Sequence, residues 1–318
     1  MKRPSGRRFK WFYIVLIAIV ALLIVSLSPV YPARIYSSQD GKALVALTFD
    51  DGYNCWTSTI LPVLQQYGMP ATGYITDPEN RQGFTWENAQ ELASAGWEIG
   101  WHTMTHEPVD NLQRSDIVND FSQAAPLFEA HNLPAPVTFA YPSGRHNSLS
   151  MQVASQYFLA SRTMETGVDT PRDVRDAPQH LEQFSMEKGL SYLENKVKKY
   201  AGQDVLVVFA GHTVGEVAPW QKKPDISVDD FKSLADFLNQ EQAAGKIDVV
   251  TLKDGVQRIL GNPYSSSWRL DVDSPFDTWY HFWIIPVPER YYIYYQAIIE
   301  DAIGHRFPQV VHLVNHYK

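Results

Sequence analysis

Two short stretches of this sequence carry side chains that could hold a metal ion and activate water. Asp50 and Asp51 follow the apolar run 43–49, and His102 and His106 lie further along the chain, four positions apart. One carboxylate and two imidazoles are a usual ligand set for a catalytic zinc ion, which keeps a fourth position open for water. Such a water becomes a nucleophile near neutral pH, and the second carboxylate could then act as the base. The pattern predicts metal-assisted hydrolysis.

Each of these motifs also has an ordinary structural interpretation. An Asp-Asp-Gly sequence after a strand is often a turn, and two histidines four positions apart often lie on a helix surface. The elements that carry the two motifs therefore decide whether the side chains can meet.

Residues 43–260 alternate between strand-like and helix-like patterns. The predicted strands are 43–49, 71–76, 97–101, 137–141, 158–162, 205–210 and 248–251. The predicted helices are 57–67, 85–95, 115–130, 148–156, 191–201, 227–244 and 252–260. Short apolar strands that alternate with helices are typical of a parallel sheet covered by helices. We predict an α/β fold, a distorted (β/α)7 barrel.

The polar residues that stand out in this pattern follow the predicted strands. They are the Asp pair at 50–51, His102, the turn 141–145, Arg162 and the pair Gly211-His212. The carboxyl ends of barrel strands meet at one mouth, where barrel enzymes place their active sites. These residues are thus expected to converge although they are far apart in the sequence.

The N-terminus predicts a membrane anchor. Residues 11–30 are almost continuously apolar, and the segment 1–10 carries five basic residues and no acidic one. The apolar run is long enough to cross a bilayer, and the basic flank predicts a cytoplasmic N-terminus. We expect a single-pass membrane protein with a short stalk at 31–42 and its main domain outside the cytoplasm. The alternative is a signal peptide, cleaved to release a secreted protein.

Charge excludes one class of partner. The formal net charge is −8 at pH 7, and the basic N-terminal segment leaves the rest of the chain more acidic still. A domain of that sign is not expected to bind nucleic acid.

Four motifs between residues 43 and 260 resemble the polysaccharide deacetylases of carbohydrate esterase family four, the NodB-homology domain. They are Thr-Phe-Asp-Asp-Gly at 48–52, His-Thr-Met-Thr-His at 102–106, Phe-Ala-Tyr-Pro-Ser-Gly-Arg-His-Asn at 139–147 and Val-Phe-Ala-Gly-His at 208–212. The first two, at this separation, are the specific ones. The resemblance implies a hydrolase that removes N-acetyl groups from a glycan.

The resemblance also implies roles for particular residues. Asp51, His102 and His106 would bind a divalent metal, with zinc the expected ion. Asp50 would be the catalytic base and His212 the catalytic acid. A backbone N–H in the turn formed by Tyr141, Pro142, Ser143 and Gly144 would stabilise the oxyanion.

The chain departs from the family pattern at two places. Many members carry an arginine before the proline of the third motif, where it orients the base, but this chain has Ala140. Arg162 or Arg145 could substitute for it, and Arg162 is favoured because it ends a predicted strand. The aspartate that partners the catalytic histidine is also not evident from the sequence; the candidates are Asp169, Asp173 and Asp176.

Residues 261–318 form a C-terminal extension beyond the resemblance. The segment is rich in aromatic residues, which occur in small buried sheets and on carbohydrate-binding surfaces alike. Its role stays open. Two other functions also stay open for the whole chain: a noncatalytic glycan-binding or assembly protein that kept the barrel, and a metal amidase or esterase acting on another acyl substrate.

Overall fold

The computed structural model of this chain describes residues 41–80 and 83–260. The predicted anchor at 11–30, most of the stalk and the C-terminal extension lie outside the described residues. Within those residues, no helix has both the length and the apolar character needed to cross a membrane.

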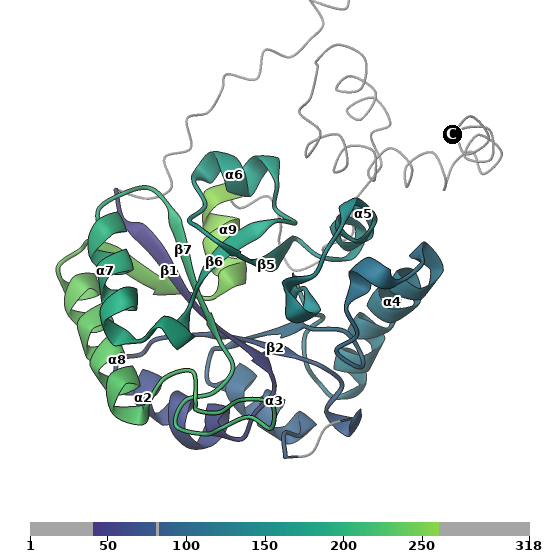
Figure 1. The fold of residues 1–318 in the computed structure, drawn as a ribbon, viewed down its shortest axis with the longest axis horizontal. Helices are drawn as coiled ribbons and strands as arrows, with labels where there is room; N and C mark the ends of the chain where they lie inside the picture. The colour runs from purple at the N-terminus through teal and green to yellow at the C-terminus, as the bar shows by residue number, and fades with distance from the viewer. Residues whose placement is uncertain (1–40, 81–82, 261–318) are drawn as a thin grey trace, which may run out of the picture. The chain divides into compact units, whose positions relative to one another are not determined.

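Eight strands form one sheet, and all their pairings are parallel. They are β1 (Ala43–Asp51), β2 (Thr72–Ile75), β3 (Glu98–Trp101), β4 (Thr138–Ala140), β5 (Ala160–Thr166), β6 (Leu181–Ser185), β7 (Leu206–Gly211) and β8 (Ile247–Val250). Strands β1 to β7 pair in sequence order, and β7 returns to β1 (Figure 1). The ring is therefore closed, which confirms the predicted seven-stranded barrel.

The membership of the ring differs from the prediction. Strand β6 was not predicted, because its sequence Leu-Glu-Gln-Phe-Ser is mostly polar and has neither an apolar run nor a regular alternation. The predicted strand 248–251 exists as β8, but it is not one of the seven. It pairs with Ala43–Ala46 of β1, whereas β2 pairs with Thr48–Asp51 of the same strand. One edge of β1 is thus divided between two partners.

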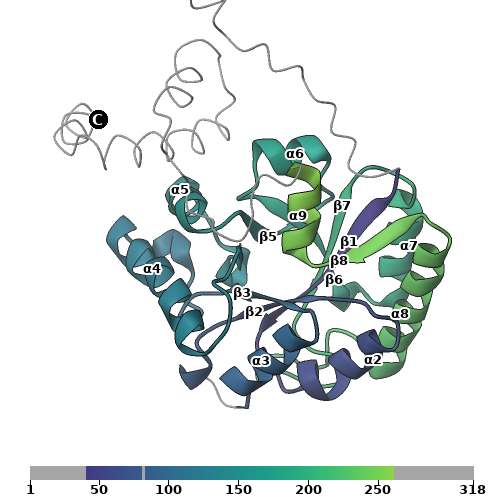
Figure 2. The same ribbon diagram turned by 180° about the vertical axis from the view of Figure 1, so that it is seen from behind.

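Helices surround the barrel in Figures 1 and 2, with α7 and α8 side by side and α6 and α9 side by side. The helices are α2 (Leu61–Gln65), α3 (Trp86–Ser94), α4 (Arg114–Ala130), α5 (Ser148–Tyr157), α6 (Pro171–Asp176), α7 (Leu190–Tyr200), α8 (Val228–Ala243) and α9 (Leu252–Leu260). A π-helical turn, η1 (Trp56–Ile60), precedes α2, and short 3-10 turns lie at η2 (Pro78–Asn80), η3 (Val109–Asn111), η4 (Pro142–Gly144) and η5 (Met186–Lys188). Side-chain caps at Thr85 and Ser227 begin α3 and α8.

Strand β1 is buried on both faces. Leu44 and Ala46 belong to the apolar cluster inside the barrel, while Val45, Leu47 and Phe49 belong to the larger cluster under the helices. A strand covered on both faces needs a continuous apolar sequence, which is why this run was recognisable.

Helix α9 lies against the amino ends of β2 and β3. The N–H groups of Leu252 and Lys253 donate to Thr72 Oγ1 at 2.9 Å and to Glu98 Oε2 at 2.8 Å. Leu252, with other residues of α9, also joins the apolar cluster inside the barrel. Helix α9 therefore covers that end of the barrel, and the polar part of the interior lies toward the carboxyl ends of the strands.

Candidate functional site

Asp51, His102 and His106 form a compact cluster at the carboxyl ends of β1 and β3. Asp51 Oδ1 lies 3.5 Å from His102 Nε2 and 3.4 Å from His106 Nε2. These separations match the edge of about 3.4 Å expected for a tetrahedral ion with bonds of about 2.0–2.1 Å. Two imidazole nitrogens and one carboxylate oxygen are also a suitable donor set for such an ion. The three residues thus fit a divalent metal such as zinc.

Several residues around this cluster have positive φ angles, a backbone conformation that residues other than glycine rarely adopt. Asp51 has a φ of 84°, Thr103 of 67° and His106 of 64°. Such residues cost free energy and are held in place by the surrounding structure, most often at functional sites. Here the left-handed residues include two of the three candidate ligands.

His102 is fixed in the orientation that a ligand needs. Its Nδ1 lies 2.7 Å from the carbonyl oxygen of Ala140, so Nδ1 carries the proton and Nε2 faces Asp51. Metal-binding histidines usually donate their second N–H to a carbonyl or carboxylate in this way. Burial lowers the pKa of His102 to about 4, against the opposing effect of Asp50 and Asp51. The imidazole is therefore neutral at physiological pH.

Asp50 is buried and paired with Arg162. Burial by itself raises the pKa of Asp50, but the charge of Arg162, with His102 and His212, outweighs burial and lowers it. The guanidinium donates from Nη2 to Asp50 Oδ2, and the other carboxylate oxygen, Oδ1, has no hydrogen-bond partner among the described residues. Asp50 is thus held as a carboxylate with one oxygen available to accept a proton.

The two candidate arginines lie in different places. Arg162 is completely buried inside the barrel, with its guanidinium carbon 5.5 Å from the centre of the Tyr74 ring. Arg145 is at the surface, where Nη2 lies 3.1 Å from Asp110 Oδ2. Only Arg162 contacts Asp50. It does not end its strand as predicted, because β5 continues to Thr166.

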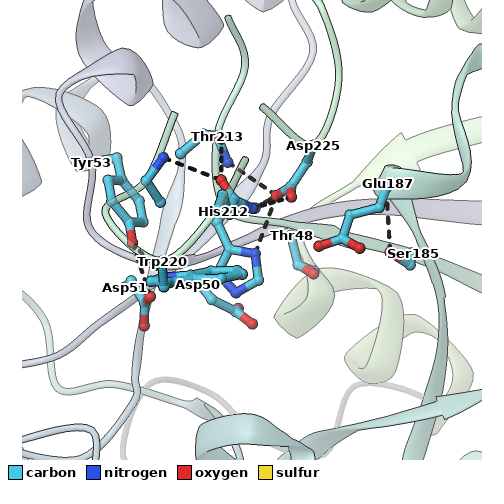
Figure 3. A network of polar contacts seen from close by, with 12 residues as sticks. Thr48, Asp50, Asp51, Tyr53, Ser185, Glu187, His212, Thr213, Trp220 and Asp225 are labelled. Atoms are coloured by element: carbon cyan, nitrogen blue, oxygen red, sulfur yellow. Dashed lines mark hydrogen bonds and ion pairs between the residues drawn. The ribbon is translucent and has the colours of Figure 1, made fainter. Parts of the chain in front are cut away.

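His212 follows β7 and pairs with Asp225. His212 Nδ1 lies 3.1 Å from Asp225 Oδ2, and the same oxygen accepts the backbone N–H groups of His212 and Thr213. Figure 3 shows one side of the imidazole bonded to Asp225 and the ring lying beside Asp50 and Asp51. Burial lowers the pKa of His212, but the hydrogen bond that His212 donates to Asp225 and the charge of Asp50 outweigh burial, so the pKa is raised. A proton is therefore retained on His212 to higher pH.

Asp225 is the site residue that sequence reasoning missed. The three aspartates suggested from the sequence have other partners. Asp169 accepts the backbone N–H of Glu182 at 3.0 Å, and Asp173 belongs to the capping box that begins α6 with Thr170. Asp176 forms an ion pair with Arg172. Asp225 lies in the connection between β7 and α8, outside any motif. No spacing marked it, because a long loop can return a side chain from many positions.

The turn after β4 contains one backbone N–H group without an acceptor among the described residues. The N–H of Tyr141 donates to Arg162 O at 3.1 Å and that of Gly144 to Tyr141 O at 2.8 Å, while Pro142 has none. The N–H of Ser143 remains without an acceptor in the described part of the chain. Gly144 is required here, since its φ is +66° and a Cβ would lie 2.5 Å from Met164 Cβ.

Aromatic residues join the loops that carry the site. Trp56 Nε1 donates to His212 O at 2.8 Å, and Tyr53 OH donates to Asp51 Oδ2 at 3.3 Å. Trp220 Nε1 donates to the Tyr53 hydroxyl at 3.2 Å, and the centre of its ring lies 4.9 Å from that of His212. Trp220 is nevertheless 58% exposed. It therefore presents an apolar face to solvent beside His212.

Fold and site together define the class of this protein. It is a parallel α/β barrel whose polar groups converge at the carboxyl ends of the strands, as in barrel enzymes. Residues 37–160 match the family model described as polysaccharide deacetylase. This part of the chain is therefore similar to the polysaccharide deacetylase family. Arg162, His212 and Asp225 lie beyond the matched residues.

Two curated relatives are similar over parts of the chain. A peptidoglycan-N-acetylglucosamine deacetylase of Bacillus cereus is 28% identical over 122 residues, which cover 37% of this chain and 54% of that protein. A bifunctional xylanase/deacetylase of Pseudobutyrivibrio xylanivorans is 32% identical over 89 residues, which cover 28% of this chain and 15% of that protein. The matched regions thus span less than two thirds of either relative.

Solved structures of carbohydrate esterase family 4 are also similar. The Xyl-CE4 domain of a multidomain xylanase from the hindgut metagenome of Trinervitermes trinervoides has a TM-score of 0.49 and 17% identity, covering 70% of this chain and 94% of that one.

Proposed function

We propose that this protein is a metal-dependent deacetylase that removes acetyl groups from the N-acetylated sugars of a polysaccharide. The observation that carries the proposal is that Asp50 and His212 both lie close to the cluster of Asp51, His102 and His106. Figure 3 shows His212 beside Asp50 and Asp51. A base and an acid beside a metal-type cluster are the groups that amide hydrolysis needs. The match of residues 37–160 to the polysaccharide deacetylase family model supports the same reaction.

Asp51, His102 and His106 would hold the ion, with zinc the expected one. A bound divalent cation supplies Lewis acidity, which makes water a nucleophile at neutral pH and polarises the acetyl carbonyl. Asp50 takes the proton of the attacking water through its Oδ1 oxygen. Arg162 keeps Asp50 ionised and orients it. It thus takes the role of the family arginine that Ala140 replaces.

His212 completes the reaction at the leaving group. It donates the proton from Nε2 to the sugar amine, because an amine leaves far more readily as a neutral molecule than as an anion. Asp225 fixes Nδ1 as the bonded nitrogen and so directs Nε2 toward the substrate. The N–H of Ser143 is the donor in the turn that would stabilise the oxyanion.

The substrate and location are part of the same proposal. An exposed indole beside the catalytic acid suits the apolar face of a sugar ring, so Trp220 supports a glycan rather than a small amide. The predicted anchor at 11–30 supports a protein held on the membrane with its barrel outside the cytoplasm. Nothing in this chemistry requires a nucleic acid partner.

The test is acetate release from N-acetylglucosamine oligomers by the full chain in a mild detergent with added zinc. We expect release that requires metal and rises with oligomer length, because remote sugars contribute binding energy. Asp50→Asn should abolish release while zinc remains bound. An enzyme that frees acetate only from O-acetylated sugars would contradict the amide substrate. A wild-type protein that binds zinc and oligomers without turnover would favour a glycan-binding role.

A further inference from the structure

A second group of metal-type side chains lies outside the site described above. His146 follows the turn η4, Glu165 lies in β5, and His180 directly precedes β6. Each offers one ligand atom, and these atoms all lie within 4.8 Å of one another. The proposed reaction uses none of the three.

The separations in this group resemble those of the first cluster. Glu165 Oε1 lies 3.2 Å from His180 Nε2 and 3.7 Å from His146 Nε2. A tetrahedral ion with bonds of about 2.0–2.2 Å places its ligands about 3.3–3.6 Å apart. The two distances from Glu165 are therefore within a few tenths of an ångström of those around such an ion, and the two imidazole nitrogens lie within 4.8 Å of each other.

The orientation of His146 is also that of a metal ligand. Its Nδ1 lies 2.9 Å from the carbonyl oxygen of Gly144, so Nδ1 donates there and Nε2 faces Glu165. His102 has the same arrangement, with Ala140 as the acceptor. A carbonyl that fixes the second nitrogen is the usual support of a metal-binding histidine. This support is independent of the distances.

Surrounding rings hold the two imidazoles together. The ring of His146 is 5.2 Å from that of Tyr141 and 5.0 Å from that of His180, between ring centres. Tyr141 donates its hydroxyl proton to the carbonyl oxygen of Gln179, the residue before His180. The buried tyrosine thus links the segments that carry both histidines. The arrangement is built by the fold and not by two freely moving surface side chains.

We propose that His146, Glu165 and His180 form a second binding site for a divalent cation of the zinc type. Two nitrogens and one carboxylate oxygen favour zinc over calcium or magnesium, which prefer oxygen ligands. Glu165 is 54% exposed on its side chain, so water completes the coordination. Among the residues that the structure describes, no further carboxylate stands beside this group in the way that Asp50 stands beside Asp51, His102 and His106. The ion has a structural role: it joins the turn after β4 to β5 and to the start of β6.

The test counts bound zinc. The full chain, purified without a polyhistidine tag and dialysed against micromolar zinc sulfate, is analysed for metal per protein by mass spectrometry. We compare the wild type with His180→Gln, Glu165→Gln and His131→Gln. His131 serves as the control because it stacks on Trp86, away from both clusters. Histidines elsewhere contribute equally to every variant, so the differences between variants carry the result.

We expect His180→Gln and Glu165→Gln each to lose one equivalent of zinc, and His131→Gln to lose none. His106→Gln should lose the zinc of the first cluster instead, so the double variant His106→Gln/His180→Gln should lose two equivalents. Zinc should also raise the melting temperature less in His180→Gln than in His131→Gln. Equal zinc content and equal thermal response in His180→Gln, Glu165→Gln and the wild type would overturn the proposal and leave the group as an ion pair. Circular dichroism confirms that each variant is folded.

Discussion

The molecule contains two clusters of one carboxylate and two histidines, and they differ in what surrounds them. Asp51, His102 and His106 lie beside the Asp50–Arg162 pair and the His212–Asp225 pair. The second cluster, built around Glu165, has neither pair beside it among the described residues and is open to solvent. Similar donor atoms at similar spacing thus provide for binding in both places, whereas the groups for catalysis occur in only one. Ligand geometry predicts a metal, and the neighbours of the ligands predict chemistry.

The strongest test of this difference exchanges a carboxylate for an amide in each cluster. Asp51→Asn should reduce acetate release by about a thousandfold, because about 4 kcal/mol of transition-state stabilisation is lost with the metal. Glu165→Gln should change it by less than about threefold, since a structural ion acts only through the turn. Steady-state assays on folded protein compare the two. Equal losses in both variants would show that the second cluster takes part in turnover.

The two arginines suggested by the sequence allow a similar test of stability. Arg162→Met leaves the buried Asp50 carboxylate without its cation and should lower the free energy of unfolding by about 3–5 kcal/mol. Arg145→Met removes an exposed ion pair with Asp110 and should lower it by less than about 1 kcal/mol. Urea unfolding monitored by tryptophan fluorescence measures both. A small effect of Arg162→Met would mean that Asp50 becomes protonated in the folded protein without cost.

The His212–Asp225 pair should appear in the pH dependence. Asp225 raises the pKa of His212, and a catalytic acid must be protonated, so activity falls as the pH rises through that pKa. Asp225→Asn lowers this pKa; the alkaline limit of kcat should move to lower pH and kcat should fall about 10–100-fold. Asp173→Asn, which alters only the cap of α6, is the matched control. An unchanged alkaline limit in Asp225→Asn would remove His212 as the acid.

The smallest expected effect concerns two exposed apolar side chains, one near each cluster. Trp220 contacts His212, and Met164 precedes Glu165. Trp220→Ala should raise KM for longer oligomers by about fivefold, equivalent to about 1 kcal/mol of ring contact. Met164→Ala should leave KM unchanged. If neither substitution affects KM, the glycan does not lie over Trp220.

The sequence predicted those parts of the molecule that depend on local pattern. The apolar runs of β1 and β7 indicated buried strands, and the groups following them indicated the mouth of a barrel. Strand β6 was not recognisable, because its pattern is short and partly polar. The predicted number of seven strands was nevertheless correct, because β8 was counted in the ring in place of β6. The correct number of strands therefore came from an incorrect set.

The candidate site was predictable where its residues occur in motifs and not where the fold alone joins them. Asp225 returns to His212 through a long loop, and the left-handed backbone of Asp51 and His106 has no signal in residue type. Arg162 was singled out as the end of a strand. It acts from the middle of one instead, because side chains alternate along β5 and Arg162 faces the interior. These features depend on tertiary packing.

The divided edge of β1 has a consequence for the order in which the barrel forms. Among the strands that the structure describes, β1 leaves the ribosome first, yet Ala43 pairs with Ile247 and Leu44 with Leu206. Strand β2 can pair early with Thr48–Asp51, but the edge that pairs with β7 and the part at Ala43–Ala46 that pairs with β8 remain open until nearly the whole domain has emerged. Contacts so distant in sequence form slowly, and an unpaired apolar strand can associate with other chains. A nascent chain that stalls before β7 is thus at risk of aggregation unless a chaperone binds the unpaired edges of β1.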